Sequence, residues 1–86
     1  MSHAFAAASP PVPREVSMSI RSGEPPARAW RRHLGLSVEE LAASASMRVD
    51  EYERLEVSSR LRDVEAWTLA SALGIWVKQL DGQRRA

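Results

Sequence analysis

The sequence predicts an all-α fold, a compact bundle of about five short helices preceded by a flexible N-terminal tail. Three observations lead to this prediction. No segment alternates apolar and polar residues as a strand would. Glycines and prolines divide the chain into pieces of helical length. Within these pieces apolar residues recur at three- and four-residue spacing, which is typical of helices with one buried face. A chain of 86 residues has room for one domain at most.

The N-terminal part of the chain is predicted to be the tail, over residues 1–24. Its first half is rich in alanine, serine and proline, and the prolines exclude a continuous helix. Residues 14–21 (REVSMSIR) form either a short helix or an extended segment, since serine and β-branched residues weaken a helix. The folded domain is then expected over residues 25–81, with a frayed end at residues 82–86.

The first helix of this domain is expected to begin at Pro25 or Pro26, because proline suits the first helical turn. Trp30 and Leu34 lie one turn apart and form its buried stripe. Gly35 ends it.

The second helix is predicted over residues 38–44 by a complete start signal. Ser37 is a good N-cap, and Glu40 three residues later completes a capping box. Leu41 and Ala42 face the core.

A break at residues 44–46 separates the second helix from a third, expected over residues 48–57 with Tyr52 and Leu55 facing inward. Two short helices around such a break have the spacing of a helix-turn-helix, the unit that places a recognition helix in the major groove of DNA.

The rest of the chain predicts a loop over residues 57–62 and two more helices. The fourth runs over residues 63–73, with Asp63 as its cap and Gly74 as its stop. Its expected buried face consists of Val64, Trp67, Ala70 and Leu73, and Leu69 widens it. The last helix is expected over residues 76–81.

Composition excludes several classes of function. There is no cysteine and there are only two histidines, so neither a thiolate nor a histidine metal site is predicted, and no cofactor is expected. No nucleophile–base pair or carboxylate pair suggests an enzyme. No apolar run is long enough to cross a bilayer, and the N-terminus lacks the pattern of a signal peptide, so the expected location is the cytoplasm.

Residues 29–80 resemble the lambda-repressor/Cro-like helix-turn-helix family, also called XRE-type. The matching stretches are WRRHLGLSVEELA (residues 30–42), RLE (residues 54–56) and LASALGIWVKQL (residues 69–80). The resemblance implies a small DNA-binding transcriptional regulator, such as a repressor. The opening GEPPARAWRRH is also similar to small bacterial members that act as antitoxins or autoregulators beside a toxin gene.

The resemblance also implies roles for individual residues. Glu56 would make a structural polar contact with a basic residue of the first helix, Arg31 or Arg32. The residues that would face DNA bases are Arg48, Val49, Asp50, Glu51 and Arg54. The residues that would face phosphates are Arg31, Arg32, Ser37, Val38, Ser58, Ser59, Arg60 and Arg62. For Arg48 and Arg54 the alternative to reading guanine is pairing with the acids around them: Arg48 with Glu51, and Arg54 with Asp50 or Glu51.

Three positions depart from the family pattern. Val38 replaces a glutamine that usually contacts the DNA backbone. Ser46 and Ser58 replace glycines, in the turn and after the third helix. Ser46 must either adopt a left-handed conformation, at a cost of about 1 kcal/mol, or change the turn.

Charge opposes the usual function of the third helix. Residues 37–57 carry six acids against only Arg48 and Arg54, whereas DNA affinity comes largely from neutralised phosphates. Two hypotheses therefore stay open. In the first, the chain is a regulator that binds an operator in double-stranded DNA, as a homodimer. In the second, the fold has lost DNA binding and docks on a basic protein, such as a toxin.

The last helix provides a candidate protein interface, formed by Trp76, Val77 and Leu80. Trp76 either folds back on the core or is an exposed anchor, since tryptophan is enriched at interface hot spots. Dimer formation through this helix is the corresponding hypothesis.

Overall fold

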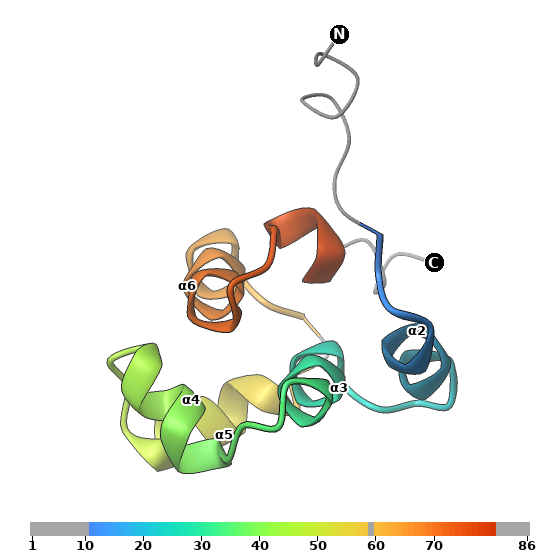
Figure 1. Ribbon diagram of the computed structural model, residues 1–86. Helices are drawn as coiled ribbons and strands as arrows, with labels where there is room; N and C mark the ends of the chain where they lie inside the picture. The colour runs from blue at the N-terminus through green and yellow to red at the C-terminus, as the bar shows by residue number, and fades with distance from the viewer. Residues whose placement is uncertain (1–10, 59, 81–86) are drawn as a thin grey trace, which may run out of the picture.

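The computed structural model describes residues 11–58 and 60–80, and within them it contains helices and no strand. The helices are α2 (Arg14–Arg21), α3 (Pro26–His33), α4 (Val38–Ser44), α5 (Val49–Glu56) and α6 (Asp63–Leu73). Residues 77–80 are also helical. The all-α prediction is confirmed. Figure 1 shows α2 at one end of the molecule and α4 with α5 at the other.

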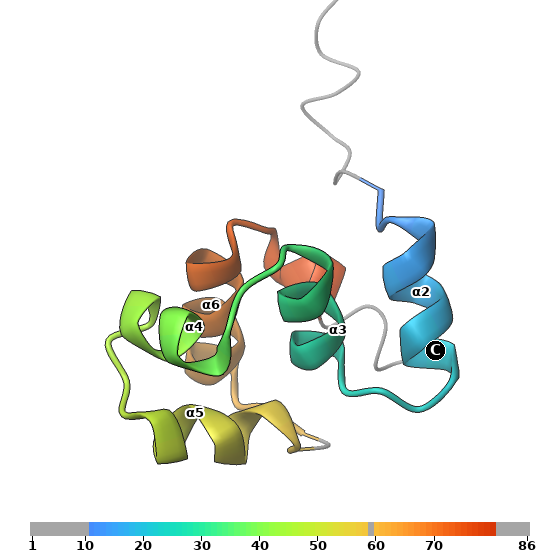
Figure 2. The same cartoon turned by 60° about the horizontal axis from the view of Figure 1, so that its bottom comes forward.

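One apolar core joins all five of these helices. Its centre is formed by side chains with almost no exposed surface: Val16, Trp30, Leu41, Tyr52, Leu69 and Leu80. Alanines complete it where helices approach closely, among them Ala42 and Ala66. α6 contacts both α3 and α4, and α5 lies across the end of the bundle against them (Figure 2).

The buried face of α6 differs from the predicted one. Val64 is 63 % exposed and Trp67 is 64 % exposed, so neither belongs to the core. Leu69, Ala70 and Leu73 are buried as predicted, and Ala66 completes the buried face in place of Val64 and Trp67. The helix is rotated so that its small alanines face α3 and α4, where space between helices is limited.

α2 belongs to the folded domain. The short helix at residues 14–21 forms, and Val16 on it is buried in the same core as Trp30. The boundary drawn at residue 25 therefore falls inside the packed part of the chain, which corrects the division into tail and domain. Residues 1–10 of the predicted tail and the predicted frayed end at residues 82–86 lie outside the described residues.

The C-terminal helical segment closes the core through Leu80 and Gln79. Leu80 is fully buried. The carbonyl oxygen of Gln79 accepts a hydrogen bond from the Trp30 indole N–H at 3.5 Å, and its side-chain amide donates to the carbonyl oxygen of Pro11 at 3.4 Å. These contacts tie the start and end of the described chain to α3. In the described part of the chain, no helix has the length and apolar character needed to cross a membrane.

Candidate nucleic-acid interface

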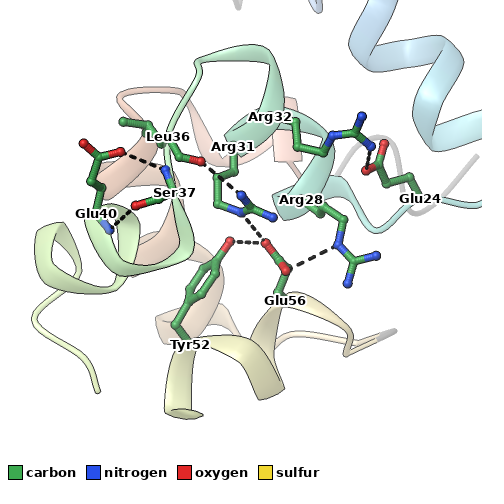
Figure 3. A network of polar contacts seen from close by, with 9 residues as sticks. All are labelled: Glu24, Arg28, Arg31, Arg32, Leu36, Ser37, Glu40, Tyr52 and Glu56. Carbon is green, nitrogen blue, oxygen red and sulfur yellow. Dashed lines mark hydrogen bonds and ion pairs between the residues drawn. The ribbon is translucent and has the colours of Figure 1, made fainter. Parts of the chain in front are cut away.

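The first helix of the candidate site, α4, is fixed at its start by the predicted capping box. The Ser37 hydroxyl accepts from the Glu40 backbone N–H at 3.0 Å, and the Glu40 carboxylate accepts from the Ser37 N–H at 2.8 Å. Arg31 donates a hydrogen bond to the carbonyl oxygen of Leu36, the residue before this cap, at 3.0 Å (Figure 3). The Ser37 side chain is therefore engaged in the cap, while Val38 beside it is half-buried against the core.

The turn between α4 and α5 is closed around Ser46, which has a φ of 57°. The N–H of Met47 donates to the Ala42 carbonyl oxygen at 2.9 Å, and the Ser46 N–H donates to Ala43 at 3.0 Å. This pair of bonds defines a Schellman motif, which requires a left-handed residue. Of the two alternatives, Ser46 therefore keeps the turn and accepts the strained conformation. Ser58 does not adopt a left-handed conformation, because Ser46 is the sole non-glycine with positive φ among the described residues.

α5 is held on the core by Tyr52, Leu55 and a buried carboxylate. Glu56 is only 5 % exposed and accepts from Arg31 Nε at 2.7 Å, from Arg28 Nε at 3.4 Å and from the Tyr52 hydroxyl at 2.6 Å. Figure 3 shows these three groups converging on the Glu56 carboxylate from α3 and α5. The expected contact of Glu56 with the first helix of the domain is confirmed, with Arg31 as the closer partner.

Electrostatics in this cluster favour the charged carboxylate. Burial alone would raise the pKa of Glu56, but hydrogen bonds from Arg31 and Tyr52 outweigh it, and the pKa lies below its ordinary value. Burial, together with the bond to Glu56, raises the pKa of Tyr52 well above its ordinary value. Tyr52 therefore stays a neutral donor and Glu56 an ionised acceptor over a wide range of pH.

The opposite face of α5 is exposed. Arg48, Val49, Asp50, Glu51 and Arg54, which were predicted to face bases, are all exposed. Together with Glu53, which is also exposed, they form the solvent-facing side of the first two turns of the helix. The structure thus brings the predicted base-facing residues together on one surface.

Two of these acids already have partners in the protein. The Glu51 carboxylate accepts from the Arg48 backbone N–H at 3.3 Å, so it caps the start of α5. The Arg48 guanidinium pairs with Asp50 instead, with Nε 3.3 Å from Oδ1. The expected side-chain pair of Arg48 with Glu51 is therefore wrong, because the backbone of Arg48 takes this carboxylate first.

The predicted phosphate contacts divide into engaged and free arginines. Arg31 is 14 % exposed at its side chain and is occupied by Glu56 and Leu36, which argues for a structural role. Arg32 pairs with Glu24 at 2.8 Å, and Arg62 pairs with Glu65 at 3.0 Å. Within the described part of the chain, neither Arg54 nor Arg60 has an acidic partner within salt-bridge distance.

The loop after α5 is ordered by Ser58, whose hydroxyl donates to the Arg60 carbonyl oxygen at 2.8 Å and accepts from the Arg60 N–H at 3.2 Å. This small ring holds the backbone of Arg60 next to the end of α5 while its side chain stays exposed. Ser59, also predicted to face phosphate, lies outside the described residues.

The candidate protein interface on the last helix is only partly available. Trp76 is 49 % exposed, whereas Leu80 is fully buried and Val77 is half-buried against the core. Leu80 is therefore corrected from an interface residue to a core residue, because the segment turns its apolar side inward. Val64 and Trp67 of α6, which were predicted to be buried, are exposed as well.

No group of acidic or histidine side chains in the described chain could hold a metal ion. A hollow of about 280 Å³ lies between α2 and α3, and the Glu24–Arg32 ion pair forms part of its wall. Comparison of the chain with protein-family models, with curated proteins and with solved structures found no match.

Proposed function

We propose that this chain is a small helix-turn-helix regulator that binds double-stranded DNA by placing α5 in the major groove. One observation carries the proposal. α5 is attached to the core through Tyr52, Leu55 and Glu56 alone, and its opposite face, with both Arg48 and Arg54, is left exposed next to the Arg60 loop. Major-groove docking requires an exposed helix face with arginines that can reach bases and phosphates.

The resemblance to the lambda-repressor/Cro-like family supports this function. In that setting, the chain would act in the cytoplasm of a bacterium as a repressor, bound as a homodimer to a palindromic operator. An antitoxin-type autorepressor, with a toxin as its protein partner, is the most specific form of the proposal. No catalytic activity is part of it.

The proposal is tested by removing one exposed cation from the loop after α5 and, separately, one from α2. Arg60→Gln should weaken DNA binding and reduce the slope of log affinity against log salt by about 0.9, because one phosphate contact is lost. Arg14→Gln removes the same charge from an exposed position on α2, at the far end from α5, and should change neither quantity.

The measurement is a fluorescence-anisotropy titration over a range of salt, on the best site from a random-sequence selection. Equal losses in the two variants would mean that DNA contacts the protein through net charge alone. A selection that enriches no sequence, together with an NMR titration at low salt that shows no binding, would exclude the proposed function.

A second candidate function is docking on a basic protein. The observation that favours it is the surplus of acid over residues 37–57: with Glu56 neutralised inside the protein, five acids and two arginines remain exposed there. Such a surface attracts a basic partner and repels phosphates.

The two functions give opposite responses to one double variant. Asp50→Asn with Glu51→Gln should raise non-specific DNA affinity if α5 binds DNA, because two charges near phosphates are removed. The same variant should weaken binding of a basic polypeptide such as polylysine if α5 is a docking surface. Amide shifts on α5 during each titration decide between them.

A further inference from the structure

We propose that the Arg48–Asp50 pair is the specificity determinant of α5 and that it reads a C·G base pair. The inference rests on the proposed DNA-binding function and adds the class of operator that this surface fits. It also gives Asp50 a role in DNA binding, although acidic residues on α5 oppose that binding on charge alone.

The two side chains form a preassembled unit at the start of α5, with Arg48 at the N-cap and Asp50 in the first turn. Arg48 Nε lies 3.3 Å from Asp50 Oδ1, and a second guanidinium nitrogen lies 3.5 Å from Oδ2. The Arg48 side chain is 74 % exposed and that of Asp50 is 68 % exposed. The pair therefore carries no net charge, and both groups have hydrogen-bonding capacity left for a ligand.

The pair contributes little to the fold. An exposed ion pair of this kind contributes at most about 1 kcal/mol to stability. Glu51, and not Asp50, caps the start of α5. Asp50 can therefore be changed without unfolding the protein, which makes its effect on DNA measurable.

Base-edge chemistry selects what an aspartate can face in the major groove. A carboxylate accepts hydrogen bonds, and the donors there are the amino groups of cytosine and adenine. Adenine places its N7 acceptor beside the amino group, which repels a carboxylate, whereas cytosine has no such neighbour on its edge. Asp50 therefore fits cytosine better than any other base.

Arg48 completes the match. Its guanidinium donates to O6 and N7 of guanine, the most common specific contact of arginine with DNA. In a C·G pair the cytosine donor lies next to these two acceptors, so a carboxylate held beside a guanidinium has the complementary pattern. Because Arg48 and Asp50 neutralise each other, the unit can enter the groove with less repulsion than Asp50 alone.

The test is a random-sequence selection with the full chain and with three variants. The unchanged chain should prefer C·G at one position by about 5- to 150-fold over T·A. Asp50→Asn should shift that position toward A·T, because an amide pairs with adenine. Arg48→Gln should abolish the preference for guanine on the other strand.

Glu39→Gln is the matched control, since it removes one exposed acidic charge from α4 and leaves the pair intact. It should raise non-specific affinity as Asp50→Asn does, while the preferred bases stay the same. Thermal unfolding by circular dichroism verifies that all three variants keep the fold.

The outcomes separate this inference from the proposed function. If a motif is selected and Asp50→Asn leaves every position of it unchanged, the base-reading role of the pair is wrong and DNA binding stands. If no motif is enriched by the unchanged chain, the inference fails, and an NMR titration with DNA at low salt then decides whether the proposed function fails with it.

Discussion

Ser46 carries a local strain that glycine would remove. Residues with a side chain lose about 1 kcal/mol in the left-handed conformation that Ser46 adopts at φ 57°. Its position in the turn is set by the bond from Met47 to Ala42, so the turn does not relax around it. This cost lies between α4 and α5, where the chain has to reverse direction to place α5.

Ser46→Gly should therefore raise the free energy of unfolding by about 1 kcal/mol, which corresponds to about 4–8 °C in melting temperature. Ser44→Gly, two residues earlier and inside α4, is the control and should lower stability by about 0.5 kcal/mol. Urea unfolding of both variants measures the two changes. A loss of stability in Ser46→Gly would mean that the serine side chain makes a compensating contact.

Glu56 should limit the stability of the protein in acid. Its pKa in the folded chain lies below the ordinary value of 4.5, so its contribution is complete above that pH and is lost as the pH falls through the folded pKa. Tyr52 acts at the other end: its pKa is raised above the ordinary 10.0, so stability falls as the pH rises beyond that value.

Glu56→Gln should lower stability by about 3 kcal/mol near neutral pH, because Arg31 loses its buried counter-charge. In Glu56→Gln the free energy of unfolding should also fall less steeply as the pH drops below 4.5. In Tyr52→Phe it should fall less steeply as the pH rises above 10.0. Urea unfolding as a function of pH gives both profiles. If Glu56→Gln loses stability in acid as steeply as the parent chain, other carboxylates cause that loss.

At the scale of elements, α2 illustrates a contact that stabilises the whole fold. Val16 is 1 % exposed and packs with the core, whereas Met18 on the same helix is 57 % exposed. Val16→Ala should cost about 2 kcal/mol, since it removes buried methyl groups and leaves a cavity. Met18→Ala should stay within about 0.5 kcal/mol of the parent. Thermal melts compare them, and equal effects would mean that α2 does not pack as described.

The sequence predicted helix boundaries better than helix rotation. The bounds of α4 and α6 follow from Ser37 and Gly74, which act locally on the backbone. The rotation of α6 depends on the space left by α3 and α4, which only the assembled fold defines. A pattern based on large apolar residues selects Trp67, whereas the narrow space accepts Ala66.

The candidate site shows the same division. The exposed face of α5 and the contact of Glu56 with Arg31 follow from local spacing and from the family resemblance. The choice of Asp50 over Glu51 as the partner of Arg48 does not, because it depends on which carboxylate the free N–H at the start of α5 captures. The three-residue spacing of Arg48 and Glu51 fits both a side-chain ion pair and a cap on the backbone N–H, so spacing alone does not choose between them.

At the scale of the molecule, the described helices should unfold together. One core includes residues from α2 to the C-terminal segment, and Gln79 links that segment to both Trp30 and Pro11. A small domain with a single core unfolds in one cooperative step. No helix here has a separate apolar cluster that would let it persist alone.

The test uses a chain with Trp67→Phe and Trp76→Phe, in which the buried Trp30 is the remaining tryptophan. Its emission reports the core, and circular dichroism reports all helices. The two melting curves should share one midpoint. Two separated midpoints would show that part of the chain unfolds independently of the core around Trp30.

The Glu56 cluster has a consequence for how α5 is aimed. Apolar contacts such as that of Leu55 resist separation of two helices but allow one of them to roll about its own axis. The two directional bonds from α3 to the Glu56 carboxylate fix that angle of roll, and the bond from Tyr52, which lies within α5, holds the carboxylate in place. Altering Glu56 therefore changes more than the energy of folding. In a Glu56 variant that still folds, α5 would be rotated about its axis and would present Asp50 and Arg54 in a different direction.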